Sequence, residues 1–261
     1  NSRPDDSTMG RAALIDTHCH LADPVFDADR TEVIARARAA GVRHALVMGE
    51  TLAGNQRVLE VCAGDRFMLP CLGHYPEHLD ATMAARSIAL IRAQRDQLAG
   101  IGEVGLDYRL AELEAERAIQ RRILAAFVQL ANQLELTLSV HSRSAGHHAI
   151  DLLVAEGARR VVLHAFDGRA VYARRALEHG YAFSIPPSIV RSPQKVKLVA
   201  ALPLEALLLE SDAPVLGPER EQRNEPASLR VAAERIAEIK RCDVEQVAAA
   251  TSALAGRLFR L

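Results

Sequence analysis

The chain lacks tryptophan and has only four cysteines and three lysines among its 261 residues. No apolar run approaches the roughly 20 residues that a membrane-spanning helix needs, which argues against a helical membrane protein. The polar stretch 1–8 has no apolar signal-peptide core, so secretion is not indicated. We expect residues 1–10 to be a disordered leader or a remnant of cloning, and residues 11–261 to form a single domain.

The four cysteines are widely spaced and form no C-x-x-C pair. Reduced thiols in a cytoplasmic protein are therefore expected, and disulfides are not. A formal net charge of −1 argues against a generally basic nucleic-acid binder. A small phosphate-binding cleft would barely change that total, so binding of a phosphorylated substrate stays open.

Eight short apolar or β-branched runs alternate with longer stretches of helical periodicity. Eight such β–α units in about 250 residues are what a (β/α)8 TIM barrel requires, with a doubly wound open sheet as the competing α/β architecture. A last helical stretch, 244–258, is expected to close or cover the barrel. The predicted strands are 12–18, 44–49, 67–73, 100–106, 136–141, 160–165, 181–185 and 206–211.

Ligand-type side chains fall at the carboxyl ends of five predicted strands. His18 and His20 share one face of the first strand because side chains alternate, whereas Cys19 between them points away. The active site of a TIM barrel lies at this end of the strands. One histidine there is usually structural, but the whole set predicts a metal centre. The other members of the set are Glu103, His141, His164 and Asp212.

Four imidazoles and two carboxylates can hold two divalent metal ions, with one carboxylate as a bridge. Nitrogen-rich ligation favours zinc, manganese or a similar ion, while magnesium, which prefers oxygen ligands, stays possible. Paired ions activate a water and stabilise both the attacking and the leaving oxygen. The residues alone therefore predict a metal-dependent hydrolase.

Five segments in order along the chain resemble the signatures of the TatD-type metal-dependent deoxyribonucleases. The resemblance runs from about Leu14 to the C-terminus. Segments 142–146, 184–189, 217–219 and 223–226 look most similar to the subgroup called TatD domain-containing protein 3. The five signature segments are 16–21 (Asp-Thr-His-Cys-His-Leu), 102–107 (Gly-Glu-Val-Gly-Leu-Asp), 140–143 (Val-His-Ser-Arg), 164–168 (His-Ala-Phe-Asp-Gly) and 210–214 (Glu-Ser-Asp-Ala-Pro).

The resemblance implies a TIM-barrel phosphodiesterase that acts on DNA, often as a 3′-to-5′ exonuclease. By position it implies two metal sites that share Glu103 as a bridge. Asp212, as a ligand or a neighbour of the attacking water, is the expected proton acceptor, so Glu103 and Asp212 are the predicted catalytic residues. The implied metal sites are His18, His20 and Glu103 with Asp212 nearby, and Glu103, His141 and His164.

One segment departs from the family pattern. Gly73-His-Tyr-Pro76 stands where the family usually has Gly-x-His-Pro, so Tyr75 replaces the expected histidine. His74 sits one place earlier and should face elsewhere. Tyr75 could donate a hydrogen bond to a substrate phosphate or pack at the barrel rim, and the sequence leaves both open.

Several polar residues beside the ligands are further candidates. Arg143 is expected to grip the scissile phosphate, with a surface salt bridge as the alternative, and Arg223 is a weaker substrate-binding candidate. Asp16 and Glu210 are expected to support the ligands from behind, Asp16 by orienting a ligand imidazole. Asp107 is a candidate loop cap.

The favoured function is hydrolysis of phosphodiester bonds in DNA by a metal-activated water, with DNA or a nucleotide phosphate as substrate and no membrane partner. Six phenylalanines and four tyrosines limit base stacking, so a short groove for strand ends is expected. An amidohydrolase or lactonase is the alternative, although many of these have a modified lysine where this chain has Glu103. A metal-binding scaffold without turnover is a third reading. We expect a cytoplasmic monomer.

Overall fold

The eight apolar runs form eight parallel strands that pair in sequence order around one sheet. The computed structural model describes residues 12–261, so the predicted leader lies outside the described residues. The TIM barrel is confirmed, and every strand end lies within two residues of its predicted position. The strands are Leu14–Cys19 (β1), Val42–Met48 (β2), Met68–His74 (β3), Gly100–Gly105 (β4), Thr137–His141 (β5), Val161–His164 (β6), Ala182–Ile185 (β7) and Leu207–Leu209 (β8).

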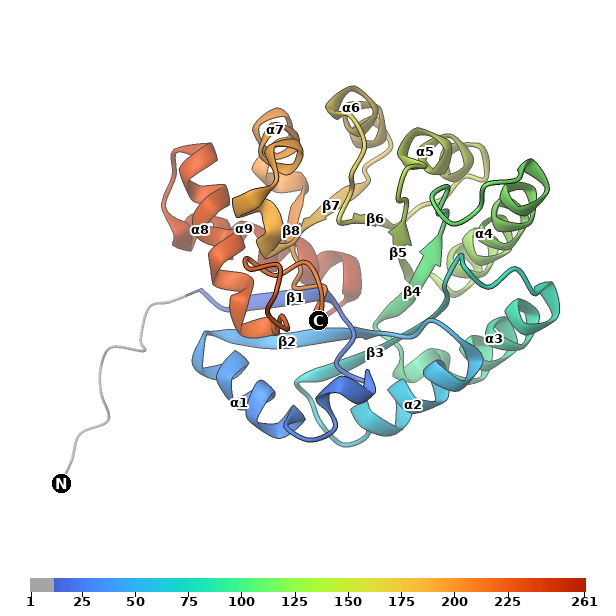
Figure 1. Ribbon diagram of the computed structural model, residues 1–261, viewed down its shortest axis with the longest axis horizontal. Helices are drawn as coiled ribbons and strands as arrows, with labels where there is room; N and C mark the ends of the chain where they lie inside the picture. The colour runs from blue at the N-terminus through green and yellow to red at the C-terminus, as the bar shows by residue number, and fades with distance from the viewer. Residues whose placement is uncertain (1–11) are drawn as a thin grey trace.

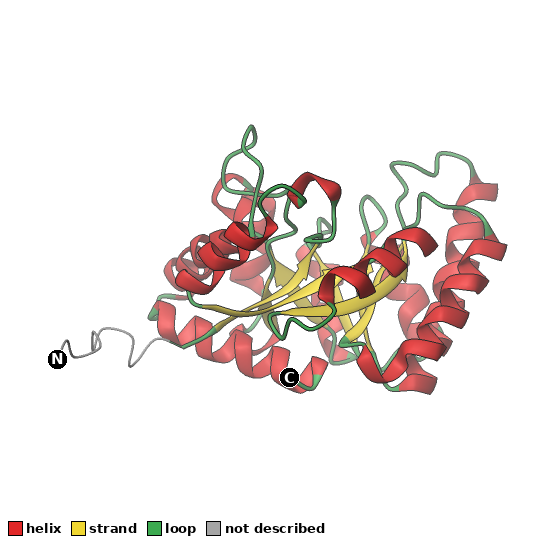
Figure 2. Cartoon of the chain, turned by 90° about the horizontal axis from the view of Figure 1, so that it is seen from below, coloured by secondary structure: helices red, strands yellow, loops and turns green. Residues whose placement is uncertain are grey.

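Helices follow the strands and surround them, as Figures 1 and 2 show. Ser192 accepts a hydrogen bond from the backbone amide of Lys195 and Pro193 follows it, so Ser192 caps the helix that begins at Pro193. None of the helices in residues 12–261 combines the length and apolar character needed to cross a bilayer. The helices are Arg30–Ala39 (α1), Leu52–Cys62 (α2), Ala81–Gln94 (α3), Glu114–Leu134 (α4), Gly146–Ala155 (α5), Ala170–Glu178 (α6), Pro193–Ala201 (α7), Leu229–Lys240 (α8) and Val244–Phe259 (α9).

Helix α9 closes the amino-terminal mouth of the barrel, as its sequence position led us to expect. Its side chains Leu254, Ala255 and Phe259 pack against the apolar side chains inside the barrel, such as Leu46 and Leu208. The starts of the strands touch it directly, since the Thr137 hydroxyl donates to the Leu258 carbonyl at 2.5 Å. The barrel therefore opens at its carboxyl-terminal mouth.

The end of β8 is tied to β1 by hydrogen bonds beyond the strand itself. The Asp212 amide donates to the His18 carbonyl at 2.9 Å, and the His20 amide donates to the Ala213 carbonyl at 2.8 Å. Asp16 accepts from both the amide and the hydroxyl of Ser211, at 2.8 and 2.6 Å. These bonds end β8 two residues earlier than predicted and bring Asp212 beside the end of β1.

Candidate metal centre

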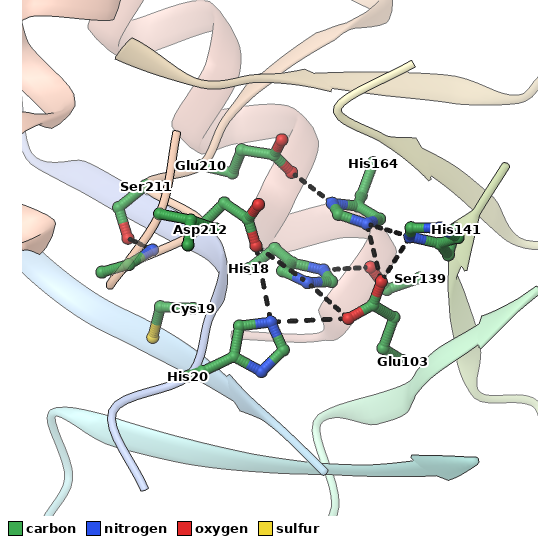
Figure 3. A network of polar contacts seen from close by, with 12 residues as sticks. His18, Cys19, His20, Glu103, Ser139, His141, His164, Glu210, Ser211 and Asp212 are labelled. Atoms are coloured by element: carbon green, nitrogen blue, oxygen red, sulfur yellow. Dashed lines mark hydrogen bonds and ion pairs between the residues drawn. The ribbon is translucent and has the colours of Figure 1, made fainter. Parts of the chain in front are cut away.

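The six predicted ligand residues meet at the carboxyl-terminal mouth of the barrel (Figure 3). They come from five different strand ends, on β1, β4, β5, β6 and the segment after β8. His18, Glu103, His164 and Asp212 are buried, and each is at most 6% exposed. Cys19 points away from the cluster, and its thiol donates to the Leu46 carbonyl at 3.4 Å, as predicted from strand alternation.

Glu103 lies between two pairs of histidines, and each of its carboxylate oxygens faces a different pair. Oε1 lies 2.7 Å from His141 Nδ1 and 2.9 Å from His164 Nε2. Oε2 lies 3.5 Å from His18 Nε2 and 3.4 Å from His20 Nε2. A carboxylate in this position can bridge two cations.

Asp212 completes one of these two groups. Its Oδ1 lies 3.6 Å from His18 Nε2 and 3.4 Å from His20 Nε2, on the same side as Oε2 of Glu103. The ligand atoms of His18, His20 and Asp212 all lie within 4.8 Å of one another, and so do those of Glu103, His141 and His164. The two groups have the composition that the resemblance implied.

The second nitrogen of each histidine faces a polar partner outside the cluster. Metal-binding histidines commonly need such a partner to set the ring orientation and the tautomer. Ser139 supplies one because it lies two residues before His141 on β5 and so faces inward. The pairs are His18 Nδ1 with Ser139 Oγ at 2.8 Å, His141 Nε2 with Asp107 Oδ2 at 2.8 Å, His164 Nδ1 with Glu210 Oε2 at 3.5 Å and His20 Nδ1 with Glu50 Oε2 at 4.0 Å.

Two predictions about these partners have different outcomes. Glu210 does stand behind a ligand ring, since it faces His164. The role predicted for Asp16 is wrong, because its carboxylate binds Ser211 and not an imidazole. Asp16 instead holds the segment after β8 against β1.

The backbone around Glu103 requires glycine on the neighbouring strand. A Cβ atom on Gly73 of β3 would lie 2.4 Å from the carbonyl oxygen of Glu103 and 2.5 Å from its nitrogen, closer than side chains can approach. Asn55 of α2 fixes this contact from behind, because its side chain bonds both the amide and the carbonyl of Gly73. The close approach of β3 therefore helps to place Glu103.

The acidic and basic members of the cluster shift each other's pKa values in opposite directions. Burial would raise the pKa of Glu103, but His164, His141 and His18 hold that pKa well below its usual value. Burial would lower the pKa of His20, but hydrogen bonds to Asp212 and Glu103 raise it well above its usual value. The directions of these two shifts favour an ionised Glu103 and a protonated His20, which is the charge pairing that a cation would replace.

The donor set fits divalent metal ions. Within the described residues, His18 Nε2 is buried and has no hydrogen-bond partner, although it points at Glu103 and Asp212. A buried nitrogen left unpaired costs free energy, and a cation between these atoms would satisfy it. Imidazole and carboxylate donors suit zinc and manganese.

The cluster forms the floor of a cavity of about 540 Å³. Tyr75 and Arg143 line this cavity, and both approach Asp107. The Arg143 Nε–H donates to Asp107 Oδ2 at 2.8 Å, and the Tyr75 hydroxyl donates to the same oxygen at 3.4 Å. The Tyr75 ring stands edge-on to His141, with centroids 5.0 Å apart.

The family model described as TatD related DNase matches residues 15–260 of this chain. The chain belongs to the TatD family. Deoxyribonuclease TATDN3 of Homo sapiens is 42% identical over 94% of this chain and 94% of its own length. The 3'-5' ssDNA/RNA exonuclease TatD of Salmonella typhimurium is 30% identical over 95% of this chain and 99% of its own. The resemblance found in the sequence is confirmed.

A solved structure of the TatD family supports the same fold. The crystal structure of YJJV, a TatD homologue from Escherichia coli K12, matches with a TM-score of 0.87 and 27% identity. The match covers 96% of this chain and 99% of that chain. The whole described barrel, and not only its metal-binding motifs, therefore corresponds to the TatD fold.

Arg223 does not join this TatD-type site. Its guanidinium binds Asp29 and the Val25 carbonyl and lies over the Phe26 ring, 4.7 Å from the ring centroid. Arg223 is not among the residues that line the cavity. In this structure an acidic partner on the loop after β1, Asp29, engages the side chain outside the cavity.

Sequence reasoning missed the main role of Asp107. Its Oδ1 caps the following loop by accepting from the Arg109 and Leu110 amides, as predicted. Its Oδ2 also accepts from His141 and Arg143, so one carboxylate holds a candidate metal ligand and a candidate substrate contact. The available signal was its place in the signature Gly102–Asp107, just after the end of β4.

Replacing Asp107 with asparagine should weaken metal binding and activity by roughly 10- to 100-fold. His141 would lose its anionic partner, and Arg143 would lose its ion pair. Isothermal titration with Mn²⁺ and initial-rate assays would measure both effects, with the exposed Asp151→Asn variant of α5 as a matched control. Equal metal affinity in the two variants would contradict this role.

Proposed function

We propose that this TatD-family protein is a deoxyribonuclease that uses two divalent metal ions to remove nucleotides from the 3′ end of DNA. The observation that carries the proposal is the division of the Glu103 carboxylate between two histidine pairs. The relatives named as deoxyribonuclease and as 3'-5' exonuclease support the choice of substrate.

The chain's own residues have distinct proposed roles. One ion would be held by His18, His20, Glu103 and Asp212, and the other by Glu103, His141 and His164. When bound, such a pair of ions activates a water and neutralises charge on the phosphate. Asp212 lines the cavity and is proposed to accept the proton of the attacking water, while Arg143 and Tyr75 contact phosphate oxygens.

The charges around the cavity explain why a metal would be required. Without metal ions the carboxylates of the lining offset its positive side chains, so an anionic phosphodiester gains little attraction. The permanent cations of the lining are Arg143 and Lys195. Two divalent ions would reverse the balance and allow an anionic substrate to enter. The carboxylates of the lining are Asp23, Glu50, Glu103, Asp167 and Asp212.

The size of the cavity favours the end of a strand over a duplex. A volume of about 540 Å³ falls within the range of small-ligand sites, which hold one or a few nucleotide-sized groups. Pro214, Val215 and Leu216 line one part of it and offer an apolar surface to a base. Helix α9 closes the other mouth of the barrel, so a strand has a single way in.

End-labelled single-stranded DNA incubated with Mn²⁺ or Zn²⁺ tests the proposal. We expect stepwise loss of 3′ nucleotides, with 5′-labelled products that shorten one residue at a time. The amidohydrolase or lactonase alternative is not favoured, because Glu103 stands where a modified lysine is common. Turnover of lactones or cyclic amides without cleavage of DNA would overturn the proposal. The cytoplasmic location and the monomeric state stay predictions.

Tyr75 offers a separate test of the substrate contact. If loss of the usual family histidine limits turnover, Tyr75→His should increase the rate of phosphodiester cleavage. Tyr75→Phe is the control, since it keeps the ring beside His141 and removes only the hydroxyl that approaches Asp107. An unchanged or lower rate in Tyr75→His would count against this idea.

A further inference from the structure

Lys195 is a buried cation that no predicted role accounts for. It lies in the first turn of α7 and is only 7% exposed, yet it lines the cavity above the metal centre. Its Nζ donates to the Ala165 carbonyl at 3.1 Å, which is its one hydrogen bond within the described residues. A lysine ammonium has three donors, so two stay available to a group in the cavity.

The position of Lys195 complements the ligands. Strand β7 contributes none of the six ligand residues, and α7, the helix after β7, contributes Lys195 instead. Ala165, which accepts its hydrogen bond, follows His164 directly and has a left-handed backbone with φ of 43°. The ammonium is thereby held beside the cluster by a backbone contact, and it forms no direct ion pair within the described residues.

The burial of this charge has a cost that a ligand could offset. Burial lowers the pKa of Lys195, and the carboxylates of Glu210, Asp167 and Asp212 only partly oppose this effect. A buried ammonium is unfavourable unless it is paired. An anionic oxygen in the cavity would supply the missing partner and the missing hydrogen bonds.

We propose that Lys195 binds a non-bridging phosphate oxygen of the substrate, as a second fixed cation beside Arg143. This inference rests on the proposed phosphodiesterase function. It predicts that the site recognises the phosphate group itself, so inorganic phosphate is a sufficient probe. Arg143 follows β5 and is held by Asp107, whereas Lys195 lies on α7 and is held by the Ala165 carbonyl. Different segments therefore position the two cations.

The decisive variant is Lys195→Gln, because its amide can still donate to Ala165 while the charge is lost. Lys197→Gln is the matched control, since Lys197 is exposed on the same helix. In the metal-loaded proteins, Lys195→Gln should weaken the binding of inorganic phosphate by roughly 10- to 100-fold. It should raise KM for single-stranded DNA by a similar factor. Metal content and melting temperature should match the control, and Lys195→Arg should restore part of the affinity.

Other results would overturn the inference. Phosphate affinity and KM equal to those of Lys197→Gln would show that the charge does not touch the substrate. Lys195→Met can be compared with Lys195→Gln. If only Lys195→Met loses bound metal, and Lys195→Gln binds phosphate as the wild type does, the role of Lys195 is to hold the Ala165 backbone and not to bind substrate. A third outcome separates the two proposals. If the wild-type protein cleaves no DNA, and Lys195→Gln binds phosphate more weakly than the wild type, the proposed nuclease function fails and the phosphate site stands.

Discussion

Replacing Glu103 with glutamine should reduce metal-dependent DNA cleavage by on the order of 10³-fold, which corresponds to about 4 kcal/mol of transition-state stabilisation. The two carboxylate oxygens face separate histidine pairs, so the substitution affects both groups at once. The amide keeps the size of the side chain but removes the charge that two cations would share. Steady-state kinetics and metal analysis of the purified variant would measure the loss.

The control for this variant is Glu60→Gln, an exposed change on α2 that removes the same charge. Its activity and metal content should equal those of the wild type. Circular dichroism should show the same secondary structure in both variants, because Glu103 contributes one side chain to a barrel with an extensive apolar core. Undiminished cleavage by Glu103→Gln would refute the bridging role.

Removal of divalent ions with a chelator should abolish cleavage and lower the melting temperature by roughly 5–10 °C. A ligand at 100 times its Kd stabilises the folded state by about 2.7 kcal/mol, and about 1 kcal/mol shifts the melting temperature of a chain of this size by roughly 2–4 °C. Differential scanning calorimetry with and without added Mn²⁺ or Zn²⁺ would measure the shift. Identical melting curves would contradict the assignment of a metal centre.

The same experiment has a defined pH dependence. Burial would lower the pKa values of His20 and His164 in the metal-free protein. Asp212 and Glu103 instead raise that of His20 well above the usual value, and Glu103 and Glu210 do the same for His164. Their protonation therefore stabilises the metal-free fold fully below about pH 6.5, and this stabilisation is lost as the pH rises through the raised pKa. Metal ions compete with these protons. The stabilisation by metal should consequently grow as the pH increases, and a shift that is largest in acid would contradict this linkage.

The fold and the ligand set could be predicted from the sequence because both depend on local patterns. Strand alternation places His18 and His20 together, and the β–α periodicity places the other ligands at the same mouth. Helix α9 could be predicted for the same reason, as a helical stretch left over after eight units. The strand boundaries differ by up to two residues, and at the end of β8 the reason is a set of non-local bonds to β1.

The supporting contacts could not be predicted, because they depend on which loops meet in space. Arg223 lies near the ligands in the sequence pattern but pairs with Asp29, nearly 200 positions away along the chain. Asp16 shares a face of β1 with His18, yet its carboxylate accepts a hydrogen bond from the Ser211 hydroxyl and none from an imidazole within the described residues. Lys195 carries no motif, and only the packing of α7 against the loop after β6 reveals that it lines the cavity.

The packing of α9 across the starts of the strands limits how a substrate can reach and leave the site. Phe259 and its neighbours fill this end of the barrel, so a nucleic-acid strand cannot pass along the barrel axis. Under the proposed function, DNA and its products would share the carboxyl-terminal mouth, and a bound product would compete there with the next substrate.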